Sequence, residues 1–162
     1  MNTTTEIRIA ELSVGNASDV IVTNGVGSCI VIIIYDRLQR VGGMAHAILP
    51  RVKNSPVVVL TRDELGKRFV KYADLAVDTL IDEIVAIGGV KEYFVAKLVG
   101  GAHMFSLLEG DKFGIGWENT VSARERLTYH HIPIETEVVG GTVGRNVRFD
   151  CATGIVEIIT KV

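Results

Sequence analysis

The sequence has few of the residues that build disulfide frameworks or metal centres. Only two of its 162 residues are cysteines, Cys29 and Cys151, and a chain of this length can bury a core that needs no covalent bridge. The two cysteines are also far from the short spacings of zinc ligands. We therefore expect two unpaired thiols, whose roles must be inferred from their neighbours.

Long apolar runs and an excess of one charge are also missing. The longest apolar run, Cys29 to Tyr35, is far shorter than the roughly 18–20 residues of a membrane-spanning helix. The first residues lack the charged-then-apolar pattern of a signal peptide. Lys and Arg number 17 against 19 Asp and Glu, without a basic stripe that could follow a phosphate backbone. We expect a cytoplasmic protein that neither enters a membrane nor binds nucleic acid.

Short β-branched and alternating segments predict many strands within one domain, residues 1–162. Cys29–Tyr35 is apolar on both faces, which is typical of a central strand covered on both sides, and Val41–Leu49 should return beside it. Helices are predicted at two places only. The expected fold is therefore α+β, a layered sandwich of mostly antiparallel sheet with two main helices.

Local signals predict the bounds of the other elements. Thr61 and Glu64 have the spacing of a capping box, so the first helix should begin there and end at Gly88-Gly89. The second helix should run from Asn119 to His130. The remaining predictions are strands at Glu6–Leu12 and Val20–Val22, a glycine loop from Thr23 to Ser28, and three final strands closing in a hairpin, Ile134–Val139, Arg145–Asp150 and Ile155–Thr160.

Cys29 and His46 fall on the two strands of one predicted hairpin. A turn centred near Arg37–Leu38 places them directly opposite each other, and a centre one residue later pairs His46 with Val31, diagonal to Cys29. The Cβ atoms would then be roughly 4.5–5.5 Å or about 7–8 Å apart. A register with an even sum would put the two side chains on opposite faces, and the sequence leaves that alternative open.

The pair suits nucleophilic catalysis. A neighbouring imidazolium can lower a thiol pKa from about 8.5 to about 3.5–7.5, which makes the cysteine a nucleophile and the histidine a proton shuttle. The glycine loop before Cys29 would offer backbone N–H groups to an oxyanion, and the Thr23 hydroxyl could orient the His46 imidazole. The alternative is structural, because cysteine is often buried as a small apolar residue.

Other chemistry-bearing residues have simpler interpretations. His130 and the histidine after it suit a solvated helix end, and Cys151 lies in a hairpin turn without a nearby histidine. Arg145 and Asn146 look like ordinary polar residues on the surface or at a cap. His103 stands in Gly100-Gly-Ala-His-Met-Phe105, where the glycines serve a tight turn and Met104 and Phe105 resemble an apolar contact tip.

Several motifs occur in a family-specific order. They are Gly25-Val-Gly-Ser-Cys29 preceded by Thr23, Gly42-Gly-Met-Ala-His46-Ala-Ile-Leu-Pro50, Gly100-Gly-Ala-His-Met-Phe105, Ile115-Gly116, Asn119 and Gly140-Gly-Thr-Val-Gly-Arg145. In this order they resemble the chemoreceptor glutamine deamidases, the CheD family of chemotaxis. The resemblance runs from about Thr23 to Gly154, nearly the whole chain.

The resemblance implies a cysteine hydrolase whose core is similar to that of the cytotoxic necrotizing factor toxins. Its nucleophile, base and orienting residue would fall on Cys29, His46 and Thr23, and no metal or organic cofactor would be needed. The implied reaction converts glutamine side chains on the cytoplasmic coiled coil of chemoreceptors to glutamate and releases ammonia.

The resemblance also implies a partner, the CheC phosphatase, which would compete with the receptor around the mouth of Cys29 and at Phe105. Without a partner we expect a monomer. Asn24 and Glu118 depart from the residues usual in the family and could alter substrate or partner choice. Two alternatives remain: a non-enzymatic regulator that binds CheC or receptors, and a cysteine hydrolase that acts on other signalling proteins.

Overall fold

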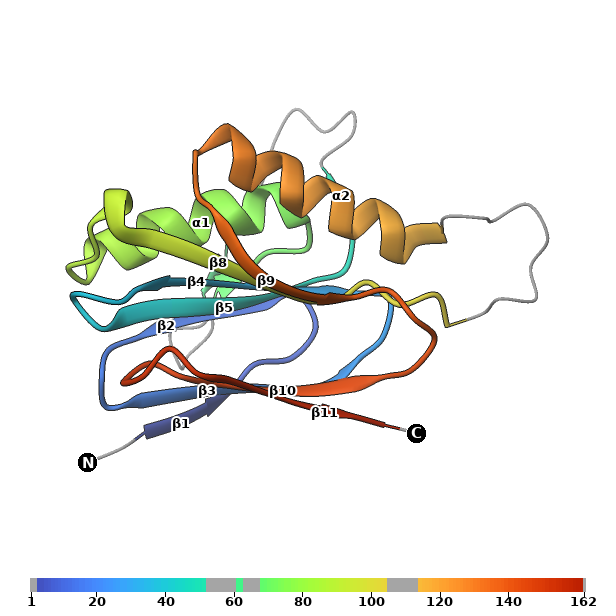
Figure 1. Cartoon of the computed structure of the whole chain (residues 1–162), viewed down its shortest axis with the longest axis horizontal. Coiled ribbons are helices and arrows are strands. Elements are labelled where there is room, and N and C mark those ends of the chain that lie inside the picture. The colour runs from blue at the N-terminus through green and yellow to red at the C-terminus, as the bar shows by residue number, and fades with distance from the viewer. Residues whose placement is uncertain (1–2, 52–60, 63–67, 105–113, 162) are drawn as a thin grey trace.

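The computed structural model describes residues 3–51, 61–62, 68–104 and 114–161. Figure 1 shows three layers: two helices cover one face of a larger sheet, and a smaller sheet lies against its other face. Among the described residues the larger sheet has seven strands and the smaller sheet has four. Both ends of the chain lie beside the smaller sheet (Figure 1).

The elements have the following bounds. In spatial order, the smaller sheet contains β1 (Thr3–Glu6), β3 (Asp19–Val26), β10 (Arg145–Asp150) and β11 (Val156–Thr160). The larger sheet contains β6 (Thr61–Arg62), β7 (Arg68–Phe69), β2 (Glu11–Gly15), β5 (Val41–Ala47), β4 (Ile30–Asp36), β8 (Phe94–Gly100) and β9 (Ile134–Val139). The helices are α1 (Ala73–Ala86) and α2 (Gly114–Tyr129), with a short 3-10 turn, η1 (Lys91–Tyr93).

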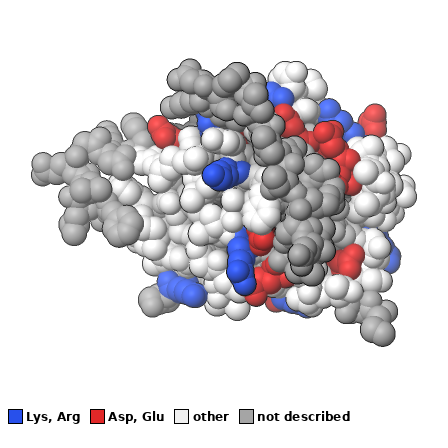
Figure 2. All heavy atoms as spheres, turned by 180° about the vertical axis from the view of Figure 1, so that it is seen from behind, with Lys and Arg blue, Asp and Glu red and all other residues white. Residues whose placement is uncertain are grey.

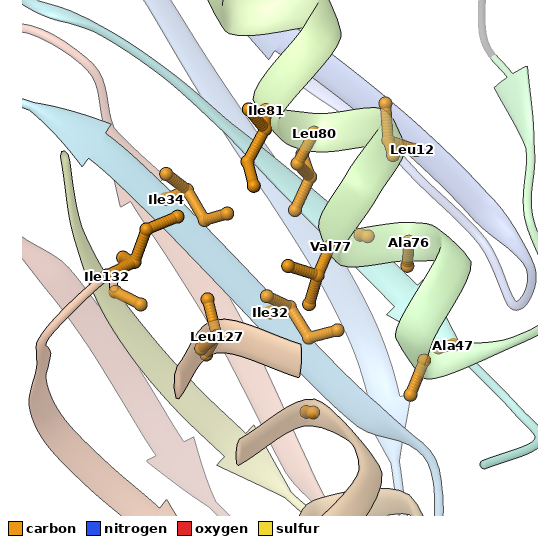
Figure 3. Close-up of a cluster of buried hydrophobic side chains, with 14 of the residues drawn as sticks. Leu12, Ile32, Ile34, Ala47, Ala76, Val77, Leu80, Ile81, Leu127 and Ile132 are labelled. Carbon is orange, nitrogen blue, oxygen red and sulfur yellow. The ribbon is translucent and has the colours of Figure 1, made fainter. Parts of the chain in front are cut away.

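Strand β4 belongs to two hydrophobic cores because its side chains alternate between the faces of the larger sheet. Ile32 and Ile34 point to the helix side, where they meet Val77 and Leu80 of α1 and Leu127 of α2 (Figure 3). Every residue of β4 is buried, as the run of β-branched residues predicts. The central strand is thus confirmed.

The second core lies between the two sheets. It contains Val31 and Ile33 of β4 together with Phe149 of β10. Glycine at residue 42 of β5 makes room for this packing, since a methyl group there would come within 2.9 Å of the Phe149 ring. The smaller sheet therefore lies close against β5, the strand that carries His46.

The α+β layered fold with two main helices is confirmed. Its sheets are mostly antiparallel, but β1 pairs with β3 and β8 pairs with β9 in parallel. The parallel pairing of β9 corrects the expected closing hairpin: only β10 and β11 form one, while β9 extends the larger sheet. At the start of the chain, β1 and β2 replace the single expected strand Glu6–Leu12.

The predicted start of the first helix is wrong. Thr61 lies in β6 and pairs with Phe69 of β7, which in turn pairs with β2; Glu64, the other half of the supposed capping box, lies outside the described residues. Inter-strand hydrogen bonds thus override a local capping pattern, and α1 begins only at Ala73. Its end before Gly88 agrees with the prediction, with the Gly88 and Gly89 N–H groups donating to Val85 and Ile84.

On the face shown in Figure 2, the described Lys and Arg side chains lie separately among uncharged and acidic residues and form no continuous basic patch. No helix in the described ranges is long and apolar enough to cross a membrane.

Candidate active site

The β4–β5 hairpin decides between the registers left open by the sequence. His46 pairs with Val31, which is the second of the two odd-sum registers and excludes the even-sum one. Cys29 lies one residue before β4, and its carbonyl accepts the Gly101 N–H at 2.7 Å, which continues the β4–β8 ladder. By strand alternation Cys29, Val31 and His46 share the face that meets the smaller sheet.

Thr23 and His46 meet across the gap between the sheets. The Oγ1 of Thr23, on β3, lies 2.7 Å from the Nδ1 of His46, on β5. Thr23 is fully buried and lies within a strand, which corrects its expected place in a loop, since β3 extends to Val26. The expected contact between its hydroxyl and the imidazole is present.

A third group, the carbonyl of Ile7, fixes the direction of this hydrogen bond. Thr23 Oγ1 donates to the Ile7 carbonyl oxygen at 2.8 Å, and a hydroxyl has a single hydrogen to give. The Nδ1 of His46 must then be the donor to Oγ1. The neutral imidazole therefore carries its hydrogen on Nδ1 and leaves Nε2 with a free lone pair. No sequence pattern pointed to Ile7, because its contribution is a main-chain atom.

His46 is held in its neutral form. The residue is completely buried, and burial lowers the pKa of its imidazole from 6.5 to about 4. Its Nε2 has no hydrogen-bond partner among the described residues. The neutral imidazole therefore keeps a lone pair on Nε2 that is available to accept a proton.

Cys29 is also in its neutral form. Only 7% of its surface is exposed, and burial raises the pKa of its thiol, a shift opposed by the residue's own backbone N–H. The expectation that an imidazolium depresses this pKa is therefore wrong for the free protein. Strand alternation places both neutral groups on one face, but His46 Nε2 makes no hydrogen bond to the thiol or to any other described residue.

The turn after β8 supports the backbone of Cys29. Gly100 has a φ of +115°, and a side chain there would collide with the Cys29 carbonyl, so only glycine fits. The Ala102 N–H donates to the Gly27 carbonyl at 2.9 Å. The segment that leads into Cys29 is thus fastened to this turn at two points, by the Gly101 and Ala102 N–H groups.

Arg145 holds this turn from the other sheet, contrary to its expected place on the surface. It is 7% exposed, and its guanidinium donates to the carbonyl oxygens of Gly100 and Gly140 at 3.2 and 2.9 Å. Asn146 also has a structural partner, since its Oδ1 accepts the Gly25 N–H at 3.0 Å. An isolated Arg-Asn pair in the sequence gives no sign of such burial.

A groove of about 360 Å³ adjoins this turn. Gly101, His103 and Trp117 are among the residues that line it. Met104, 41% exposed, packs beside Gly27, where a methyl group would lie 3.2 Å from its Cγ. An exposed apolar side chain therefore lies beside the segment that leads into Cys29, while Phe105 lies outside the described residues.

The remaining candidates are structural. Cys151 is fully buried with its pKa raised to about 12, and both cysteines are free. His130 is not a solvated helix end: its Nε2 lies 2.7 Å from the Asp78 carboxylate, which Arg126 also binds. These contacts link α2 to α1. In the part of the chain that the structure describes, no cluster of three or more His, Cys, Asp or Glu could hold a metal ion.

Comparison with known proteins decides the family. A family model described as CheD chemotactic sensory transduction matches residues 59–160, well over half of the chain. The chain belongs to the CheD family. The matched range begins after Thr23, Cys29 and His46, so the assignment is independent of these three residues.

Curated CheD relatives extend the similarity over almost the whole chain. A protein of Geobacillus kaustophilus named "Probable chemoreceptor glutamine deamidase CheD" is 41% identical over 157 residues, covering 96% of this chain and 91% of its own length. "Chemoreceptor glutamine deamidase CheD" of Halalkalibacterium halodurans is 36% identical over 165 residues, covering 99% and 95%. A Geobacter metallireducens protein, "Probable chemoreceptor glutamine deamidase CheD 2", is 40% identical over 154 residues, covering 94% and 90%.

Proposed function

We propose that this protein is a cytoplasmic protein-glutamine deamidase that hydrolyses glutamine side chains of chemoreceptors to glutamate through a thioester on Cys29. Membership in the CheD family and the names of the relatives support the substrate. The observation that carries the mechanism is the chain of hydrogen bonds from Ile7 through Thr23 to His46. It leaves the His46 Nε2 free on the face that Cys29 shares.

In the first half-reaction His46 Nε2 takes the Cys29 proton as the sulfur attacks the amide carbon of the glutamine side chain. The resulting imidazolium keeps its Nδ1–H bond to Thr23. The oxyanion forms next to the Cys29 backbone N–H, the donor that already lies close to the sulfur. Collapse of the intermediate transfers the proton from Nε2 to the leaving nitrogen and releases ammonia, so a thioester and a neutral imidazole remain.

In the second half-reaction water attacks the thioester carbon while His46 Nε2 takes a proton from it. The tetrahedral intermediate then expels the sulfur, which recovers a proton from the imidazolium. The products are the original thiol and a glutamic acid side chain, which ionises to glutamate by giving its proton to the released ammonia. Atoms and charge balance with water as the sole co-reactant, and Thr23 never exchanges a proton.

The proposal is tested with a receptor cytoplasmic fragment, the wild type, Cys29→Ala and Cys151→Ala. The last variant is a matched control because it removes the other buried thiol. Peptide mass spectrometry should show glutamine-to-glutamate conversion with the wild type and Cys151→Ala, with equimolar ammonia, and none with Cys29→Ala. Equal conversion by Cys29→Ala and wild type would refute the thioester mechanism.

We further propose that CheC binds at the same mouth and competes with the receptor. The exposed Met104 beside Gly27 supplies an apolar contact there. CheC should raise the KM for the receptor fragment without changing kcat, and Met104→Glu should weaken this inhibition. Ile159→Glu serves as the control, because Ile159 is an exposed apolar residue of the smaller sheet. Inhibition that leaves KM unchanged would contradict a shared site.

A further inference from the structure

Asn119 of α2 connects the segments that carry Cys29 and His46. Its side chain is completely buried. Its Nδ2 donates to the carbonyl oxygen of Ser28 at 2.9 Å and to that of Ile48 at 3.1 Å. Ser28 immediately precedes Cys29, and Ile48 follows His46 by two residues. One amide group thus contacts the main chain on both sides of the proposed reactive pair.

The chemistry of the two partners leaves one orientation for this amide. Both are carbonyl oxygens, which only accept hydrogen bonds, so the amide must present its NH₂ group to them. That nitrogen has two hydrogens, and each carbonyl takes one. An aspartate of the same shape has no hydrogen to donate when ionised, a serine has one, and a glutamine is longer by one methylene in a fully buried space.

The amide acts where the β4–β5 ladder stops. Ile30 and Ala47 form the last pair of this hairpin, so Cys29 and Ile48 stand just beyond it. Past this point the two strand ends would be free to separate. The two bonds from Asn119 hold the carbonyls on either side together and so extend the connection past the end of the ladder.

The same helix offers a comparison. Ser122, less than one turn further along α2, donates from its hydroxyl to the Pro50 carbonyl. It is buried like Asn119 and also joins α2 to the main chain after β5. Within the described ranges, however, its hydroxyl makes no hydrogen bond to the segment before Cys29. Ser122 therefore joins α2 to the main chain after β5, as Asn119 does. Only Asn119 also holds the residue that precedes Cys29.

We propose that Asn119 is a positioning residue that sets the separation between the Cys29 thiol and the His46 imidazole. This inference rests on the proposed function, in which the thiol proton passes to His46 Nε2. Asn119 takes no part in bond making. A displacement of the order of 1 Å between reacting groups can lower a rate by about 100-fold, so a clamp at this position controls the chemical step.

The first test is the kinetics of Asn119→Asp and Asn119→Ser on the receptor fragment, with Ser122→Ala as control. Asn119→Asp should lower kcat by about 100-fold at an unchanged KM, because the substrate-binding surface stays in place. Asn119→Ser keeps one donor and should lose less. Ser122→Ala should keep its kcat even where its melting temperature falls as far as that of Asn119→Ser. A loss that appears in KM, or equal losses in the Asn119→Ser and Ser122→Ala variants, would overturn the proposal.

The second test needs no receptor. The rate of Cys29 alkylation by iodoacetamide is measured at pH 7 in a Cys151→Ala background for Asn119→Ser, His46→Ala and the double variant. Asn119→Ser should slow alkylation, and adding it to His46→Ala should slow it no further, because both act on the same proton transfer. Additive losses, or a wild-type rate in Asn119→Ser, would contradict positioning. If the wild type leaves the receptor unmodified while this pattern holds, the proposed substrate fails and the role of Asn119 stands.

Discussion

The hydroxyl of Thr23 and the imidazole of His46 form a 2.7 Å hydrogen bond between side chains of two different sheets. The bond determines which nitrogen of His46 carries hydrogen, because the same hydroxyl donates to the Ile7 carbonyl. Thr23 therefore does more than hold the ring in place. It selects the tautomer that leaves Nε2 free, as the proposed base requires.

Replacing Thr23 by valine tests this role. The variant keeps the shape of the side chain but leaves the His46 Nδ1–H buried without an acceptor, which costs about 1–3 kcal/mol. We expect the ring to turn or change tautomer and kcat to fall by about 100-fold. Thr23→Ser keeps the hydroxyl and should stay within a few-fold of the wild type. Nitrogen NMR of His46 should show hydrogen on Nδ1 in the wild type; hydrogen on Nε2 would contradict the proposed base.

The pH dependence of activity follows from the pKa of His46, which burial lowers from 6.5 to about 4. The base works when neutral, so kcat/KM for the receptor fragment should lose activity on the acid side only near pH 4. On the alkaline side the profile should stay level through neutrality, since burial raises the Cys29 pKa. Ammonia release measured across this range checks both limbs. A loss of activity already near pH 6.5 would mean that the His46 imidazole is exposed or paired with a carboxylate, and would contradict the buried neutral base.

The same shift links folding stability to pH. Between about pH 4 and 6.5 the unfolded chain binds a proton at His46 and the folded chain does not, so stability rises with pH through this window. The contribution is complete above pH 6.5 and is lost as the pH falls toward 4. It should amount to about 3 kcal/mol. Denaturant unfolding of wild type and His46→Gln at pH 7 and pH 4.5 isolates it, because the other titrating groups are common to both proteins.

Two glycine positions allow the effect of backbone strain to be distinguished from the effect of a steric clash at the proposed active site. Gly100 and Gly88 both have strongly positive φ, +115° and +108°. A methyl group at Gly88 would meet nothing within 4 Å, whereas at Gly100 it would collide with the Cys29 carbonyl. Both alanine variants should lose about 1–3 kcal/mol of stability through backbone strain. Only Gly100→Ala should also lose deamidation and slow the alkylation of Cys29; wild-type kcat in that variant would contradict the supporting role of the turn.

The sequence predicted the part of the site that depends on strand periodicity. An apolar run, a turn and a returning strand place Cys29 and His46 on one face once the register is odd, and the observed Val31–His46 pairing is one of the two registers expected. The expected contact of the Thr23 hydroxyl with the His46 imidazole is also present. The layered α+β fold followed from the count of strand and helix patterns.

Contacts between segments distant in sequence could not be predicted. The carbonyl of Ile7 has no signature in the side-chain pattern, and Arg145 resembles a surface residue until β10 places it under the Gly100 carbonyl. The capping pattern at Thr61 gave a wrong start for the first helix, because Thr61 forms a strand pair with Phe69. The direction of the Cys29 pKa shift was also wrong, since burial depends on packing of the complete fold.

The packing of Phe149 against Gly42 has a consequence for catalysis. Gly42 lies four residues before His46 on β5, and the ring of Phe149 belongs to the sheet that carries Thr23. A methyl group at residue 42 would stand 2.9 Å from this ring and 2.8 Å from the Ile34 carbonyl oxygen, so the opposite sheet and the neighbouring strand β4 would both have to shift. Core volume at residue 42, far from the thiol, therefore bears on the Thr23–His46 hydrogen bond and on the base that we propose.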